Sequence, residues 1–204
     1  MPKTSLAIVT IVAAVLTAAA ILWLDAPTAD ASYGVRESWL HGLARRLGKA
    51  GEIHWYLVPA LALALVWHKA HPPRARKALF VATAVGAAGL VSLALKAVIG
   101  RTRPLLWMED GVHHIHFFQF EYNHMAFPSG HATTAFATMT ALAILFPRAA
   151  VPLLGVATLL AAARVVGLSH YLSDVTAGAW LGAVTAIALA PRMLPVAAKE
   201  TPPE

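Results

Sequence analysis

Six apolar segments, each with few or no charges and each bounded by charged residues, constrain this chain more than any other feature. Such a segment has no polar face to present to water, and a helix satisfies its backbone in a lipid bilayer. Six of them leave too little polar sequence for a soluble domain, because 58% of the 204 residues are hydrophobic and 13% are charged. The sequence therefore predicts an all-α integral membrane protein, a bundle of six transmembrane helices. We place the spans near residues 5–24, 53–68, 78–96, 131–146, 149–164 and 174–190.

Residues 1–204 are expected to form a single membrane domain, because no internal repeat and no low-complexity linker divides them. The amino-terminal span allows a second interpretation, since Ala29-Asp30-Ala31 resembles a signal-peptidase site after an apolar stretch. The apolar run is longer than an ordinary signal core. We therefore expect an uncleaved first span.

The segment after the first span has the pattern of an amphipathic helix that lies in the lipid headgroup layer. Its apolar residues fall near one helical face and its cations fall elsewhere. The apolar residues are Val35, Trp39, Leu40, Leu43 and Leu47, and the cations are Arg36, Arg45, Arg46 and Lys49. We expect this helix to anchor the protein at the interface, and the alternative is that it steers an anionic lipid inward.

Charge and cysteine content restrict the partners. A chain without cysteine has no disulfide, no thiolate nucleophile and no Cys-ligated metal. The net charge of +6 could favour nucleic acid, but basic residues in a membrane chain set topology and contact headgroups, and the sequence contains no nucleic-acid-binding module. We expect membrane lipids and no nucleic acid as partners, and the oligomeric state stays open.

The charged ends of four spans meet on one face of an up-and-down bundle. Lys96 ends the third span, His131 begins the fourth, Arg164 ends the fifth and Asp174 begins the sixth. Charged groups are costly at membrane depth, so a cluster of them marks a functional site. Lys and Arg are equally divided between the two sides, but the compact basic loop 69–77 favours an inside amino terminus. The cluster would then lie on the outer face.

The same face collects groups that bind phosphate. Pro128 suits the first turn of a helix, Gly130 lets a ligand approach the backbone, and the free N–H groups of such a turn attract anions. Lysine supplies a mobile charge and arginine a fork for two oxygens. Each cation alone could be a flank that reaches the headgroups, but together they indicate a phosphate site. Its expected members are Lys96, Arg103, Ser129, Gly130 and Arg164, with Arg101 in the same region.

Two histidines supply candidate chemistry at this site. His170 and Asp174 are spaced i, i+4, so on a helix they share a face and the carboxylate can hold one imidazole N–H. The other ring nitrogen of His170 would attack phosphorus and form a phosphohistidine. His131 would protonate the leaving oxygen and later activate water. A His-Asp pair at this spacing can also be only a structural hydrogen bond.

These residues resemble the three-part signature of the type 2 phosphatidic acid phosphatase superfamily, which also includes vanadium-dependent haloperoxidases and glucose-6-phosphatase. The three parts are Lys96-x6-Arg103-Pro104, Pro128-Ser129-Gly130-His131 and Arg164-x5-His170-x3-Asp174. The resemblance implies a metal-independent phosphatase without a cofactor. Ala163 departs from the pattern, because the family usually has Ser before the third-part arginine, and this puts one secondary hydrogen bond in doubt.

The resemblance also implies roles and a location. His170 would be the nucleophile, His131 the acid and Asp174 the residue that orients His170, with phosphate held by the five residues named above. The small bacterial-type members that the chain is similar to act on undecaprenyl diphosphate, phosphatidylglycerophosphate, phosphatidate or lipid A. They lie in the bacterial inner membrane with the site facing the periplasm or exterior.

The loop between the first and second parts of the signature is rich in aromatic residues and histidines. It could act as a lid over the headgroup. A metal site built from His113, His114 and His116 with Glu109 or Asp110 is conceivable, but we expect none. The alternative function for the whole chain is a non-catalytic protein that binds or transports lipid phosphates. Cations alone would serve that function, so the two histidines and Asp174 favour the enzyme.

Overall fold

The computed structural model describes residues 3–112, 114–118 and 120–194. Its α-helices are α1 (Lys3–Ala19), α2 (Asp25–Gly34), α3 (Trp39–Lys49), α4 (His54–Ala70), α5 (Pro72–Ile99), α6 (Pro104–Asp110), α7 (Gly130–Leu145), α8 (Ala150–Val166) and α9 (Leu172–Met193). A π-helical turn, η1 (Ala20–Leu24), and two 3-10 turns, η2 (Tyr122–His124) and η3 (Pro147–Ala149), complete the elements. The described residues form no strand beyond an isolated antiparallel bridge between Arg101 and Ile115.

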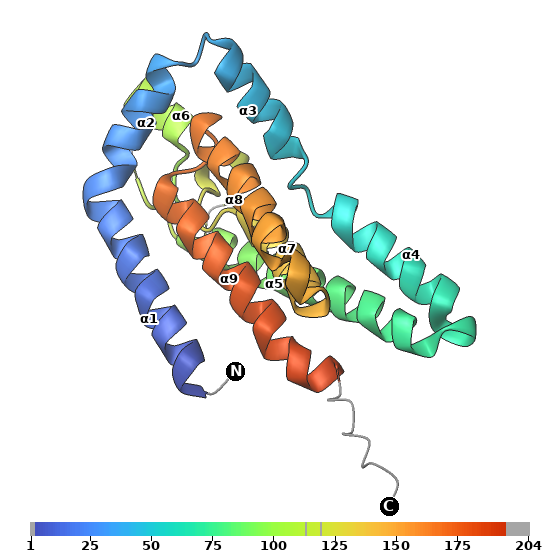
Figure 1. Cartoon of the computed structure of the whole chain (residues 1–204). Coiled ribbons are helices and arrows are strands. Elements are labelled where there is room, and N and C mark those ends of the chain that lie inside the picture. The colour runs from blue at the N-terminus through green and yellow to red at the C-terminus, as the bar shows by residue number, and fades with distance from the viewer. Residues whose placement is uncertain (1–2, 113, 119, 195–204) are drawn as a thin grey trace, which may run out of the picture.

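Each predicted span coincides with a helix, and the predicted all-α membrane fold is confirmed. Five helical stretches of the described chain are long and apolar enough to cross a bilayer, and α7 is a shorter apolar helix. The first stretch, Leu6–Gly34, is longer than predicted because α1 continues through η1 into α2. The amino end of α1 and the carboxyl end of α9 lie at the same end of the bundle, as an even number of crossings requires (Figure 1).

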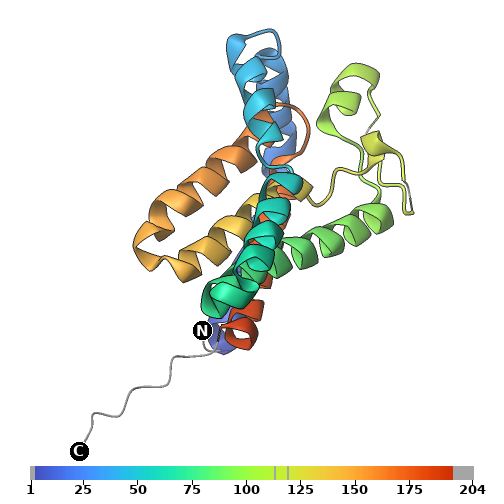
Figure 2. The same cartoon turned by 90° about the vertical axis from the view of Figure 1, so that its right-hand side faces the viewer.

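Helix α7 forms the centre of the bundle. It packs against α5, α8 and α9, while α4 covers α5, α1 covers α9 and α3 lies along α8 (Figures 1 and 2). Glycines let α9 approach α7 closely. A Cβ added at Gly178 would lie 2.5 Å from the carbonyl oxygen of Ser129, and one at Gly182 would collide with the backbone of Thr133. These contacts hold the start of α7 against the first half of α9.

Helix α3 has the two faces predicted for an interfacial helix. Ala44 and Gly48 are buried against α8, and Nδ1 of His41 hydrogen-bonds to the carbonyl oxygen of Val166 at 3.0 Å. On the other face the side chain of Trp39 is 78% exposed, and those of Leu40 and Leu43 are also exposed. The helix therefore rests on the bundle with one face and leaves apolar side chains exposed on the other, as the interfacial interpretation requires.

Candidate active site

A cavity of about 690 Å³ lies where α4, α5 and α7 meet the loops that follow α3, α5 and α8. Five of the predicted site residues line it: Lys96, Arg103, Gly130, His131 and His170. The other three, Ser129, Arg164 and Asp174, are buried residues that are not part of the cavity lining. The fold therefore brings the predicted residues into one region. Five of them form the cavity surface, and three are buried outside it.

His170 lies in the turn between α8 and α9, and its side chain is 1% exposed. Its Nδ1 atom is 2.8 Å from the carbonyl oxygen of Ala126. A carbonyl oxygen can only accept, so Nδ1 carries the proton. Nε2 is then the ring atom with the lone pair, and His170 lines the cavity.

The surroundings of His170 favour the neutral ring. Burial lowers the pKa of His170 well below its usual range, and the positive charges of Lys96 and Arg103 lower it further. Both effects penalise the imidazolium form. The residue therefore has the protonation state that a nucleophile or base requires.

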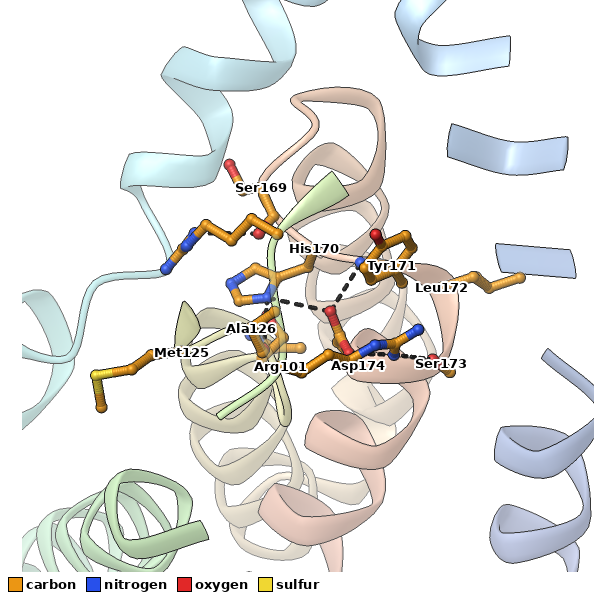
Figure 3. A network of polar contacts seen from close by, with 12 residues as sticks. Arg101, Met125, Ala126, Ser169, His170, Tyr171, Leu172, Ser173 and Asp174 are labelled. Atoms are coloured by element: carbon orange, nitrogen blue, oxygen red, sulfur yellow. Dashed lines mark hydrogen bonds and ion pairs between the residues drawn. The ribbon is translucent and has the colours of Figure 1, made fainter. Parts of the chain in front are cut away.

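The expectation that Asp174 holds the imidazole N–H on a shared helical face is wrong. Helix α9 begins at Leu172, so His170 lies outside it. The carboxylate Oδ2 of Asp174 is 3.6 Å from Nδ1 of His170, and it accepts a hydrogen bond from the backbone N–H of Tyr171 at 2.8 Å instead (Figure 3). Asp174 is thus a close neighbour of Nδ1, while the backbone carbonyl of Ala126 makes the hydrogen bond that orients the ring.

Backbone carbonyls of the loop before α7 also hold two of the cations. Nζ of Lys96 donates to the carbonyl oxygen of Met125 at 2.7 Å. Arg103 donates through Nε to the carbonyl of Tyr122 at 3.0 Å, and its guanidinium lies 3.8 Å from the centre of the Tyr122 ring. Both side chains line the cavity, so their charges face the space where an anion would bind.

Among the described residues, Oγ of Ser92, which lines the cavity, and Nε of Arg164, which is buried outside the lining, have no hydrogen-bond partner. Buried polar groups are normally satisfied, so the Ser92 hydroxyl is available for a hydrogen bond to a molecule in the cavity. Arg164 was predicted from the sequence. Ser92 was not, although it lies one helical turn before Lys96 and that spacing was a usable signal.

The start of α7 differs in detail from the prediction. Ser129 is the residue that caps the helix, and its Oγ accepts from the N–H of Ala132 at 3.5 Å. Pro128 therefore precedes the helix and does not occupy its first turn. The Ser129 hydroxyl is used within the helix cap, whereas Gly130 and His131 line the cavity. The first turn thus opens on the cavity, and the free N–H groups of a helix amino terminus favour an anion.

The linker between α3 and α4 covers His131. A Cβ added at Gly51 would lie 3.1 Å from the Cβ of His131 and 3.3 Å from its ring Cδ2. A side chain at this position would require His131 to shift by a few tenths of an ångström. Glu52 and His54 continue the cavity wall from the same linker and the start of α4.

Comparison with known proteins identifies the fold family. A model of the PAP2 superfamily matches residues 77–195, more than half of the chain and all three parts of the signature. The chain belongs to the PAP2 superfamily. A crystal structure of a transmembrane PAP2 type phosphatidylglycerolphosphate phosphatase from Bacillus subtilis covers 90% of this chain with a TM-score of 0.59 and 20% sequence identity. At that identity the likeness shows the shared PAP2 fold.

Two curated PAP2 relatives are more similar in sequence. A lipid A 1-phosphatase of Rhizobium johnstonii is 41% identical over 106 residues, which are 50% of this chain and 43% of that protein. A lipid A 1-phosphatase of Rhizobium etli is 38% identical over 115 residues, which are 54% of this chain and 50% of that protein. The chain thus matches half or less of the length of these relatives.

The His-rich loop of this PAP2 protein brings three imidazoles together outside the cavity. The rings of His114 and His116 are 5.5 Å apart, and those of His116 and His124 are 5.7 Å apart. Within the described ranges, no three potential ligands are grouped closely enough to hold a metal ion. His113 lies outside the described residues. The possible role of the loop as a lid stays a prediction.

Proposed function

We propose that this chain is a membrane lipid phosphatase that hydrolyses a lipid phosphomonoester or diphosphate through a phosphohistidine. The observation that carries the proposal is the state of His170. Nδ1 of His170 donates a hydrogen bond to the carbonyl oxygen of Ala126, and burial lowers the pKa of the ring. The side chain lines the cavity together with Lys96 and Arg103. A neutral imidazole held in this way beside phosphate-binding cations is suited to nucleophilic attack on phosphorus.

The reaction would proceed in two displacements. Nε2 of His170 forms a bond to phosphorus while the bond from phosphorus to the lipid oxygen breaks, and His131 gives its proton to that oxygen. His131 then takes a proton from a water molecule, the resulting hydroxide bonds to phosphorus while the bond from phosphorus to Nε2 of His170 breaks, and inorganic phosphate leaves. Lys96, Arg103 and Arg164 would stabilise the charge on the equatorial oxygens.

The apolar part of the cavity supports a lipid substrate. Ile53 and Leu57 of the α4 side and Leu90 and Leu93 of α5 line it below the charged end. Leu90 and Leu93 are 70% and 57% exposed, so this wall continues to the outer surface of the helix bundle, where bilayer lipid would lie. A headgroup phosphate could therefore reach the cations while the acyl or prenyl chain stays in an apolar environment.

The relatives support lipid A-type glycolipid phosphates as the first substrates to test. Undecaprenyl diphosphate, phosphatidylglycerophosphate and phosphatidate are the other candidates from the resemblance.

We further propose that hydrolysis needs no metal ion. We also propose that the cavity faces the periplasm or exterior of a bacterial inner membrane, in line with the topology inferred from the charges.

Phosphate release by detergent-purified protein, with excess chelator and each lipid class in turn, tests the proposal. We would compare the unchanged protein with His170→Ala and with His68→Ala, a matched control because His68 is an exposed histidine on α4. The expected result is chelator-resistant release that His170→Ala loses and His68→Ala keeps. Release that persists in His170→Ala contradicts the mechanism. Tight lipid-phosphate binding without turnover would favour the non-catalytic alternative.

A second measurement locates the intermediate. Trypsin cleaves after Arg164 and Arg192, so His170 lies in one peptide of residues 165–192. After a short reaction quenched in alkali, which preserves phosphohistidine, mass spectrometry should find one phosphoryl group on His170 in that peptide. Phosphate found on another residue would reassign the nucleophile.

A further inference from the structure

A buried network of polar side chains connects α2, which continues the first apolar helix, to the start of α9. The turn just before α9 contains His170 and is called the His170 turn. Asp25 begins α2 and Arg101 follows α5. Ser173 and Asp174 lie in the first turn of α9, and Figure 3 shows them beside Arg101. All four side chains are buried. Residues this far apart in the sequence meet only because the fold brings the ends of three helices together.

Arg101 is the centre of this network. Its two terminal nitrogens are divided between two carboxylates: one donates to Oδ1 of Asp174 at 2.7 Å and the other to Oδ2 of Asp25 at 2.8 Å. The guanidinium also lies 4.1 Å from the centre of the Tyr171 ring. The Arg101 guanidinium is thus held by a carboxylate at each terminal nitrogen and by the Tyr171 ring against its plane.

Asp25 binds the beginning of α9 directly. Its Oδ1 accepts the backbone N–H of Ser173 at 2.9 Å, and its Oδ2 accepts the Ser173 hydroxyl at 2.5 Å. The same hydroxyl oxygen accepts from Arg101 at 2.7 Å. An acidic side chain at a helix amino terminus is favourable. Asp25 therefore holds α9 and Arg101 in one arrangement.

The network of Asp25, Arg101 and Asp174 depends on the charge of each of the three side chains. Two carboxylates share one guanidinium inside a bundle where water is scarce, and removing one partner leaves a buried charge without full compensation. If Asp25 lost its charge, Arg101 would keep one full partner and could rotate towards Asp174. If Arg101 lost its charge, two carboxylates would remain close together and Asp174 would lose its cation.

We propose that Asp25 and Arg101 are positioning residues that hold Asp174, and through it the His170 turn, in the reactive arrangement. Asp25 fixes Arg101, Arg101 fixes one oxygen of Asp174, and the other oxygen holds the Tyr171 N–H and faces Nδ1 of His170. Neither Asp25 nor Arg101 is part of the cavity lining, and both contact the first turn of α9, so they are placed to act through Asp174. The inference rests on the proposed phosphatase function.

Asp25 gives the first membrane helix a part in the reaction. It lies outside residues 77–195, the part of the chain that matches the superfamily model, whereas Arg101 and Asp174 lie inside. Helix α2, which precedes the matched region, thus supplies Asp25 to the network that holds the His170 turn. This relationship also requires that the first span stays attached, since cleavage after Ala31 would remove Asp25.

Steady-state kinetics on the lipid that the unchanged protein hydrolyses would test the inference. The variants are Asp25→Asn, Arg101→Gln, Arg101→Lys and the double variant of Asp25→Asn with Arg101→Gln. Asp30→Asn is the matched control, because it makes the same chemical change at an exposed position of α2. Thermal unfolding of each variant, followed by tryptophan fluorescence, separates lost folding from lost catalysis.

The expected result is a fall in kcat of about 10- to 100-fold for Asp25→Asn and Arg101→Gln, with KM within about twofold, as for other residues that orient a reacting group. Arg101→Lys should recover part of the loss because it keeps the charge. The double variant should lose about as much as Arg101→Gln alone, since both residues act through Asp174. Asp30→Asn should match the unchanged protein.

Three outcomes overturn the inference. An unchanged kcat in folded Asp25→Asn and Arg101→Gln shows that Asp174 needs neither residue. A raised KM at constant kcat shows a substrate contact instead. If kcat falls only in proportion to the unfolding temperature, and Arg101→Lys recovers none of it, the two residues contribute to stability alone. Failure of the proposed function is distinguishable, because the unchanged protein and Asp30→Asn would then also release no phosphate, and the inference would fail with it.

Discussion

The carbonyl oxygen of Ala126 accepts the Nδ1 proton of His170 at 2.8 Å, whereas the carboxylate of Asp174 is 3.6 Å from the same atom. The ring orientation of the proposed nucleophile is therefore set by the main chain of the loop before α7. Asp174 contributes its negative charge and its hold on the Tyr171 N–H. The two contacts divide a task that the sequence suggested for Asp174 alone.

Replacing Asp174 should consequently be less damaging than replacing His170. In Asp174→Asn the Ala126 hydrogen bond remains, but the nearby negative charge is lost and Arg101 loses a charged partner. We expect kcat to fall by at least about tenfold, yet to stay above that of His170→Ala. Phosphate-release kinetics on both variants would check this order. Equal losses would mean that Asp174 is indispensable for the nucleophile.

The pH dependence should reflect the charges around His170. Burial, Lys96 and Arg103 lower the pKa of His170 below its ordinary 6.5, and the neutral form is the nucleophile. The acid limb of kcat/KM that belongs to His170 should therefore lie below pH 6.5, with activity lost as the pH falls through it. Lys96→Met removes one cation, so its acid limb should move to higher pH. A limb that moves to lower pH would contradict this electrostatic account.

The Ser92 hydroxyl should contact the bound phosphate. It is buried, lines the cavity and has no partner among the described residues. Ser92→Ala should raise KM by about 5- to 10-fold, the equivalent of one hydrogen bond of about 1 kcal/mol, with little change in unfolding temperature. Thr158→Ala, at an exposed position on α8, is the control. A Ser92→Ala protein with normal KM would show that the hydroxyl is satisfied in another way.

Close packing of α9 on α7 should make Gly182 intolerant of a side chain. A Cβ there collides with the backbone of Thr133, and no flexible side chain can move aside. Gly182→Ala should cost about 1–3 kcal/mol of the free energy of unfolding and lower the unfolding temperature. Gly155→Ala is the matched control, because nothing lies within 4 Å of a Cβ at that helical glycine. If both variants unfold at the same temperature, the helices do not pack as described.

The sequence alone determined the class of protein and the approximate membrane spans. Both follow from local properties: hydrophobicity along a segment of about 20 residues and charges at its ends. The order of the spans placed Lys96, His131 and Arg164 near one face, because alternate helix ends must meet in an up-and-down bundle. The motif residues were therefore recognisable before their contacts were known.

Only the tertiary structure decided the contacts within the site. The sequence suggested a helical His170–Asp174 pair and a helical Pro128, but the helices begin at Leu172 and Gly130. Helix ends depend on which groups satisfy the terminal N–H bonds, and here those groups come from elsewhere in the chain. Asp25 binds Arg101 across 76 residues and Ser173 across 148. No local pattern encodes such contacts, because they exist only once the whole bundle has packed.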